Sequence, residues 1–130
     1  MKLFKSYQEE YKDGEQLRDF VYVKDIVDGM WDLMSTEHNG VNGIYNMGTG
    51  VARSFKDLVE ATFKAMDQKS QIEYIEMPAN IKNQYQYFTQ AKMEKFKFAL
   101  PNFKFHNLED GVTDYVKNYL MQENPFIRSR

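Results

Sequence analysis

The stretch Arg18-Asp19-Phe20-Val21-Tyr22-Val23-Lys24-Asp25 is the most informative part of this 130-residue sequence. Its apolar run from Phe20 to Val23 predicts a short buried strand. Asp25 then opens a segment whose apolar residues recur at three- and four-residue steps, which is typical of an amphipathic helix. An acidic residue at the head of such a segment fits an N-cap better than a catalytic acid. The stretch therefore predicts a strand that leads directly into a helix.

Arg18 is the first candidate for binding chemistry. An arginine at the end of a buried strand can turn its guanidinium towards a cleft, and this planar fork of donors suits two phosphate oxygens. The alternative is an ion pair between Arg18 and Asp19 or Asp25 that only fixes the loop. The spacing of the residues leaves both interpretations open.

The remaining sequence predicts a mixed α/β structure with several helices and few, short strands. Residues 1–17 are polar and aromatic, and we expect a loop there with a turn at Asp13-Gly14. The first helix should end near Glu37, before Asn39-Gly40. Its apolar positions are Ile26, Val27, Met30, Trp31, Leu33 and Met34.

The second half of the sequence is divided by capping residues and prolines. Ile44 to Met47 and Ile72 to Ile75 predict short strands, and Pro78 ends the latter. Ser54 with Asp57 forms a capping box before a helix whose apolar face is Phe55, Leu58, Val59, Thr62, Phe63 and Met66. We expect a short helix from Ala91 to Leu100, ended by Pro101. A last helix is capped by Asn107 with Asp110, and its apolar face is Leu108, Val112, Tyr115, Val116, Tyr119 and Leu120. These helices have little sheet to pack on, which indicates part of a larger structure.

Composition excludes several classes of function. The chain is 42% hydrophobic and 28% charged, close to the average for globular domains, and it has no cysteine. Disulfides, thiolate metal sites and cysteine nucleophiles are therefore excluded, and a cytoplasmic location is expected. A net charge of -2 argues against nucleic-acid binding, and no apolar run is long enough for a membrane helix. His38 and His106 lack metal-ligand spacing, so we predict structural roles for them and no metal site.

Two further motifs are weaker. Gly48-Thr49-Gly50 follows a predicted strand and precedes a helix, as a phosphate-binding turn does, but Arg53 stands where the dinucleotide fingerprint needs glycine. A plain tight turn is the better interpretation. Tyr85, Tyr87 and Phe88 could stack on a base or sugar, or simply pack.

The order of these motifs resembles the C-terminal region of the extended short-chain dehydrogenase/reductases. The similar segments are R-D-F-V-Y-V-x-D from Arg18, G-I-Y-N-x-G-T-G from Gly43, and S-F-x-D-L from Ser54. Three more segments, namely residues 71–75, 85–91 and 109–115, are similar to the ADP-L-glycero-D-manno-heptose 6-epimerase family within that group. The resemblance spans nearly the whole chain.

The resemblance implies a fold and an activity. The fold is α/β, and residues 1–130 would be the C-terminal, sugar-nucleotide-binding region of a Rossmann-like enzyme, mostly helical with a few short strands. The intact enzyme would be an isomerase that inverts C6 of the heptose in ADP-heptose, using NADP to oxidise and then reduce the sugar. Its product would enter lipopolysaccharide core synthesis. The alternatives are another nucleotide-sugar epimerase or dehydratase of the superfamily, or a non-catalytic module that binds a nucleotide sugar or a protein.

The resemblance also assigns site residues. Arg18 would bind the substrate's phosphates and Tyr85 would contact the substrate. The segment beginning K-L-F would line the pocket through Phe4, Lys5, Ser6 and Tyr7.

The family's glycine-rich NADP turn and its catalytic Tyr-x-x-x-Lys pair have no counterpart in these 130 residues. We therefore expect no catalytic residue, no bound cofactor and no activity in this chain alone, and we expect the N-terminal Rossmann domain to be absent. The apolar helix faces that such a domain would cover predict a homo-oligomer.

Overall fold

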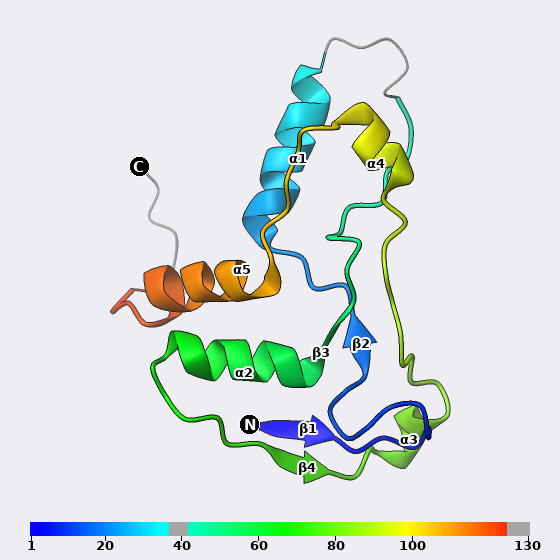
Figure 1. Cartoon of the computed structure of the whole chain (residues 1–130), viewed down its shortest axis with the longest axis vertical. Helices are drawn as coiled ribbons and strands as arrows, with labels where there is room; N and C mark the ends of the chain where they lie inside the picture. The colour runs from blue at the N-terminus through cyan, green and yellow to red at the C-terminus, as the bar shows by residue number, and fades with distance from the viewer. Residues whose placement is uncertain (37–41, 125–130) are drawn as a thin grey trace.

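The computed structural model describes residues 1–36 and 42–124, and it confirms a mixed α/β chain whose helices are longer than its few, short strands (Figure 1). The elements in chain order are β1 (Lys2–Phe4), β2 (Leu17–Arg18), α1 (Val23–Ser35), β3 (Arg53–Ser54), α2 (Phe55–Ala65), β4 (Glu73–Ile75), α3 (Ala79–Lys82), α4 (Glu94–Ala99), α5 (Leu108–Tyr115) and the π-helical η1 (Val116–Leu120). Helices α1 and α4 lie at one end, β1, β4 and α3 at the other, and α2 and α5 between them (Figure 1).

The strands form two small sheets. β1 pairs in parallel with β4, and Leu3 lies opposite Tyr74. β2 pairs antiparallel with β3, and Arg18 lies opposite Arg53. A single parallel bridge joins Leu17 to Phe88. Segments far apart in the sequence are therefore held together by a few backbone hydrogen bonds rather than by a continuous sheet.

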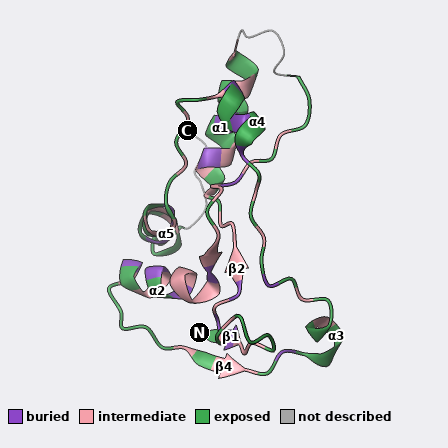
Figure 2. Cartoon of the chain, turned by 45° about the vertical axis from the view of Figure 1, so that its right-hand side comes forward, coloured by how far each residue is buried: buried purple, intermediate pink, exposed green. Residues whose placement is uncertain are grey.

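The apolar core is divided in the same way, and buried residues are spread thinly along the elongated chain (Figure 2). Helix α2 packs on α5, and burial there is greatest at Val59, Ala65 and Val116. A second cluster joins α1 to α4, where Phe96 is 1% exposed and contacts the rings of Phe103 and Phe105. Phe105 and Phe103 also contact each other, with ring centroids 4.9 Å apart.

The deciding stretch folds differently from the prediction. The strand predicted from Phe20 to Val23 is wrong, because the helix already begins at Val23 and the strand lies earlier, at Leu17–Arg18. Asp25 is not the N-cap, a position that Tyr22 occupies without a side-chain hydrogen bond. Instead, Asp25 is 2% exposed within the first turn of the helix.

The buried Asp25 carboxylate has its partners in a distant segment. It accepts the backbone N–H of His106 at 2.8 Å and contacts His106 Nδ1 at 2.5 Å. Because a buried carboxylate must be hydrogen-bonded, this contact ties the start of α1 to the segment before α5. His106 therefore has the structural role predicted for it.

Two other predictions are wrong because a strand forms only where a second strand pairs with it. Residues 1–17 are not all loop, since β1 finds a partner in β4. The strand predicted from Ile44 to Met47 does not form, and Ile44 is 90% exposed. Helix α1 ends at Ser35, two residues before the predicted end near Glu37. Glu37, His38 and Asn39-Gly40 lie outside the described residues.

The locally encoded features are confirmed. Ser54 and Asp57 form both hydrogen bonds of the capping box, and Asn107 accepts the backbone N–H of Asp110 at 2.8 Å. β4 spans Glu73–Ile75 within its predicted range. Helix α4 is shorter than predicted and begins at Glu94.

The Asp19 carboxylate joins three segments of the chain. It accepts the Thr49 hydroxyl at 2.6 Å and the backbone N–H groups of Thr49, Gly50 and Ala91 at 2.8, 2.9 and 3.0 Å. Partial burial acts to raise the pKa of Asp19, but the hydrogen bonds from Thr49, Ala91 and Gly50 outweigh it and hold the pKa below its ordinary value. The ionised carboxylate therefore stabilises the folded state.

Asp19→Asn should lower the free energy of unfolding by about 2 kcal/mol at neutral pH, because the amide replaces an acceptor of charge-assisted hydrogen bonds with a donor. A carboxyl whose folded pKa is depressed contributes its stability above the ordinary value of 3.8 and loses it as the pH falls through the folded pKa. Urea unfolding should therefore show the full difference in free energy of unfolding between wild type and variant at about pH 7. At about pH 3 this difference should be smaller. An equal difference at both pH values would contradict this account.

Within residues 1–36 and 42–124, no helix combines the length and the apolar character needed to cross a membrane. Over the same ranges, no three His, Asp or Glu side chains come together as metal ligands would.

Candidate functional site

The Arg18 guanidinium lies against two aromatic rings. Its central carbon is 5.3 Å from the ring centre of Tyr85 and 5.7 Å from that of Phe55. Nη1 donates to the carbonyl of Leu17 at 2.7 Å, and Nη2 donates to the carbonyl of Gln86. These contacts orient the guanidinium without neutralising its charge.

The predicted ion pair of Arg18 is not formed. The Asp19 carboxylate binds the turn at Thr49, and the Asp25 carboxylate is buried against His106. Among the described residues, no acidic side chain pairs with Arg18. The ion-pair interpretation is therefore wrong, and the role of Arg18 in ligand binding stays a prediction.

Both rings that Arg18 contacts line a cavity of about 200 Å³. It is lined by Lys2, Leu3, Phe4, Gln16, Phe55 and Tyr85. The rings of Phe4 and Tyr85 meet edge to face, with centroids 6.1 Å apart. Burial raises the pKa of Tyr85, and the positive charge of Arg18 opposes that rise. The cavity therefore combines apolar walls with the Lys2 side chain, and the Arg18 guanidinium lies against two of its rings, a setting that suits a small anionic ligand.

The predicted site residues Lys5, Ser6 and Tyr7 continue from Phe4 along the edge of β1. The Ser6 N–H donates to Asp13 Oδ1 at 2.7 Å. Lys5 pairs with Glu76 at 2.7 Å, and the Tyr7 hydroxyl donates to the same carboxylate. The hydrogen bond to Glu76 raises the pKa of Lys5. The charge of Lys5 is therefore shared with an acid, unlike that of Arg18.

Tyr87 joins this loop to the cavity. Its side chain is 8% exposed, its ring packs against Tyr85 with centroids 5.5 Å apart, and its hydroxyl accepts the Tyr7 N–H at 2.9 Å. The cluster predicted from Tyr85, Tyr87 and Phe88 thus divides: Tyr85 faces the cavity, Tyr87 is a packing residue, and Phe88 is 50% exposed.

The sequence interpretation missed two residues of the site. Phe55 was assigned to the apolar face of α2, yet it lines the cavity beside Arg18. Gln16 is 1% exposed, and its Nε2 donates to the carbonyls of Phe4 and Lys5 at 3.3 Å each. The sequence around Gln16 is aromatic and charged and did not indicate that this residue is buried. The carbonyls that Gln16 binds belong to Phe4 at the end of β1 and to Lys5 directly after it.

The Gly48-Thr49-Gly50 segment is a plain turn, as preferred from its sequence. Its backbone N–H groups at Thr49 and Gly50 donate to the Asp19 carboxylate. A carboxylate of the chain itself therefore occupies the donors that a phosphate would need.

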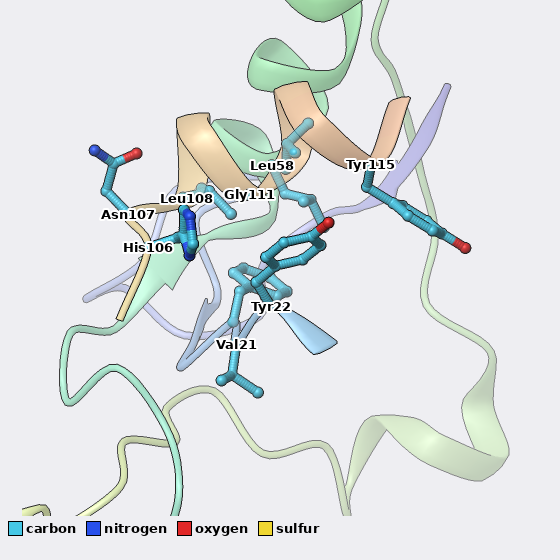
Figure 3. Close-up of a pocket in the computed structure, with 10 residues that line it drawn as sticks. Val21, Tyr22, Leu58, His106, Asn107, Leu108, Gly111 and Tyr115 are labelled. Atoms are coloured by element: carbon cyan, nitrogen blue, oxygen red, sulfur yellow. The ribbon is translucent and has the colours of Figure 1, made fainter. Parts of the chain in front are cut away.

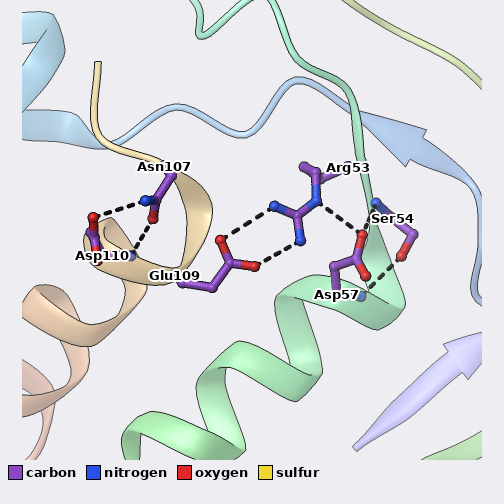
Figure 4. Close-up of polar contacts among 6 residues, drawn as sticks. All are labelled: Arg53, Ser54, Asp57, Asn107, Glu109 and Asp110. Carbon is purple, nitrogen blue, oxygen red and sulfur yellow. Dashed lines mark hydrogen bonds and ion pairs between the residues drawn. The ribbon is translucent and has the colours of Figure 1, made fainter. Parts of the chain in front are cut away.

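Arg53, which lies opposite Arg18 in the β2–β3 pair, has a structural role (Figure 4). Its Nη2 and Nη1 are 2.7 and 3.3 Å from the Glu109 carboxylate, and its Nε is 3.1 Å from Asp57. The hydrogen bond from Arg53 lowers the pKa of Glu109. This pair ties β3 and α2 to α5, so Arg53 is not available for an anion.

A second cavity of about 190 Å³ lies between residues 20–22, α2 and α5 (Figure 3). Its walls are mostly apolar, with Tyr22 and His106 among them. Burial, reinforced by the hydrogen bond to Asp114, raises the pKa of Tyr22 to about 12. The hydrogen bond from Lys24 lowers the pKa of Asp114 to about 2. The charged groups beside this cavity are paired with each other, so it is the weaker candidate for an anionic ligand.

Comparisons with known proteins identify similar enzymes. The chain is 50% identical, over 98% of its length, to an ADP-L-glycero-D-manno-heptose-6-epimerase from Nitratidesulfovibrio vulgaris (strain DP4), of which it covers 39%. It is 49% identical to the enzyme of the same name from Fusobacterium nucleatum, of which it covers 40%. The chain thus spans about two fifths of the length of these curated relatives.

Solved structures of similar fold include other epimerases. The crystal structure of ADP-L-glycero-D-manno-heptose-6-epimerase from Helicobacter pylori matches with a TM-score of 0.68 and 30% identity, over 91% of this chain and 32% of that one. A UDP-glucose 4-epimerase from Bifidobacterium longum, in complex with NAD⁺ and UDP, also has a TM-score of 0.68, over 92% of this chain and 35% of that one. Its 22% identity shows the fold alone.

The fold thus defines part of an extended short-chain dehydrogenase/reductase. Residues 2–101 match the family model described as GDP-mannose 4,6 dehydratase, and the chain belongs to this family.

Tyr87→Phe should loosen the loop that carries Lys5 to Tyr7, because the Tyr7 N–H loses its acceptor while the packed ring remains. Amide hydrogen exchange followed by NMR should show faster exchange at Tyr7, by about tenfold for the loss of one hydrogen bond. Tyr115→Phe, on the exposed side of α5, is the matched control and should leave that rate unchanged. Equal exchange at Tyr7 in wild type and Tyr87→Phe would show that the hydroxyl does not hold the loop.

Proposed function

We propose that this chain supplies the substrate-binding part of an NADP-dependent nucleotide-sugar epimerase. The reaction is the conversion of ADP-D-glycero-D-manno-heptose to ADP-L-glycero-D-manno-heptose, and the product enters lipopolysaccharide core synthesis. The observation that carries the proposal is the Arg18 guanidinium, which has no acidic partner among the described residues and lies beside a cavity with aromatic walls. Identity of about 50% to heptose epimerases over nearly the whole chain supports this substrate.

The chemistry of a nucleotide diphosphate sugar fits this site. A guanidinium presents several N–H donors in one plane and binds phosphate oxygens in pairs. Two of these donors are used by the carbonyls of Leu17 and Gln86, which leaves the other N–H groups for the ligand. In the proposed complex Arg18 binds the diphosphate and Tyr85 contacts the substrate beside it. Phe4, Lys5, Ser6 and Tyr7 line the same edge.

The described residues do not fit the dinucleotide cofactor. The glycine-containing turn at residues 48–50 has its N–H groups bound by Asp19. We therefore assign residues 1–130 to the substrate side of the cleft, with NADP and the catalytic residues held by a Rossmann domain outside this chain. That this chain alone is inactive, and that the intact enzyme is cytoplasmic, stay predictions.

The identity of the base and sugar has a specific alternative. The family model is described by a GDP-sugar reaction, and solved structures of similar fold were determined with UDP sugars. The substrate of another epimerase or dehydratase would carry the same diphosphate but a different base. Relative affinities for ADP, UDP and GDP separate these alternatives.

Arg18→Met should weaken ADP binding to the chain by about tenfold or more, because the charged donors of the guanidinium are lost. Isothermal titration calorimetry at low salt measures this, with adenosine as the ligand that lacks phosphates. Lys64→Met removes the same charge from the exposed side of α2 and should leave the affinity unchanged. Equal ADP affinity in wild type and Arg18→Met would contradict the role of Arg18, and preference for UDP or GDP would favour the alternative substrates.

We also propose that the exposed face of α1 associates with a second copy of the chain. The exposed fractions of Val23, Val27, Met30, Trp31 and Met34 lie between 53% and 72%. A contiguous apolar face of this kind favours association in water.

Trp31 is the single tryptophan of the chain, so its fluorescence reports on this face. Its emission should move to shorter wavelength as the protein concentration rises, with a parallel increase in mass by light scattering. Val27→Glu should abolish both changes, because a charge cannot be buried unpaired. Phe98→Glu, at a 91% exposed position on α4, is the control and should abolish neither. A monomeric mass at all concentrations would refute the proposal.

A further inference from the structure

Phe55 is the feature of the site that the proposed function leaves unexplained. It has no polar side-chain atom with which to bind a nucleotide sugar, yet it lines the cavity and its ring centre lies 5.7 Å from the Arg18 guanidinium carbon. We propose that Phe55 is a positioning residue that holds the Arg18 guanidinium in the orientation that receives a diphosphate. This inference rests on the proposed function and adds a residue to its site.

The ring of Phe55 is itself firmly placed. Phe20 meets it edge to face, with ring centroids 5.4 Å apart and planes at 82°. Phe55 is the first residue of α2, directly after the Ser54 capping box, and its N–H donates to the carbonyl of Gln16 at 3.2 Å. A side chain fixed by a helix start, a neighbouring ring and a backbone hydrogen bond can in turn restrict the flexible Arg18.

An aromatic ring is suited to this task because it orients a cation without cancelling its charge. Arg53 shows the other solution: its direction is set by Glu109 and Asp57, which also neutralise it. Arg18 is oriented instead by two rings and two backbone carbonyls. Its full positive charge therefore stays available to an anion, and the side-chain entropy lost on binding is smaller because the guanidinium is already ordered.

Of the two rings, Phe55 is the one whose role is separable from ligand contact. Tyr85 carries a hydroxyl and is itself proposed to touch the substrate, so its loss would mix two effects. Phe55 offers the guanidinium an apolar surface and a negative ring face, and nothing else. Replacing it by leucine keeps an apolar side chain and removes the ring.

Two measurements on the full 130-residue chain test the inference. In Phe55→Leu the affinity for ADP should fall about fivefold while that for adenosine is unchanged. Phe55→Tyr, which keeps the ring, should retain the wild-type affinity for ADP. In NMR spectra of the free protein, the Arg18 side-chain NεH resonance should shift in Phe55→Leu, because the ring current of Phe55 is lost while that of Tyr85 remains, and it should stay near its wild-type position in Phe55→Tyr.

Phe103→Leu is the matched control. It also removes a ring from edge-to-face contacts with other phenylalanines, in the cluster between α1 and α4, and it should alter neither the ADP affinity nor the Arg18 resonance. An ADP affinity in Phe55→Leu equal to that of wild type, while Arg18→Met loses binding, would overturn this inference alone. Failure of the wild-type chain to bind ADP would overturn the proposed function and this inference together.

Discussion

The hydrogen bonds to the Asp19 carboxylate hold together a chain that has little sheet. The strands are two or three residues long, so backbone pairing alone cannot fix the segments that contain Asp19, Thr49 and Ala91. The ionised Asp19 side chain takes the place of hydrogen bonds between strands, because it accepts three backbone N–H groups and a hydroxyl. Gly48 is part of the same constraint, because a Cβ there would lie 2.7 Å from Asp19 Oδ2 and 2.8 Å from the Ala91 Cβ.

This junction places Arg18 next to its cavity and divides the roles of two arginines that face each other in the β2–β3 pair. Arg53 is bound by Glu109 and Asp57 and joins α2 to α5, whereas Arg18 is held by aromatic rings and backbone carbonyls. The same side chain thus serves as a structural tie where carboxylates surround it and as a receptor for an anion where they do not. The two acids that the sequence offered as ion-pair partners for Arg18, Asp19 and Asp25, are both bound elsewhere.

The sequence predicted well wherever the cause of a structure lies within a few residues. The capping box at Ser54 and the N-cap at Asn107 are local hydrogen bonds, and both formed as expected. Predictions failed where a distant segment decides. β1 is a strand because β4 lies beside it, and the run from Ile44 to Met47 stays irregular because no strand within the described ranges pairs with it. For the candidate site, Arg18, Tyr85 and Phe4 were foreseen: Phe4 and Tyr85 line one cavity, and Arg18 contacts the Tyr85 ring. Gln16 and Phe55, which line the same cavity, were not foreseen.

By itself, the sequence determined the mixed α/β class, the start of α2 and α5, the family resemblance and a cation as the main candidate for ligand binding. Only the tertiary structure decided what each charge does. Asp25 became a buried partner of His106 rather than a helix cap, and Arg18 kept its charge free of ion pairs. The physical reason is that charges and rings act over a few ångströms of space, and their neighbours here come from residues as far apart in the chain as Arg18 and Tyr85.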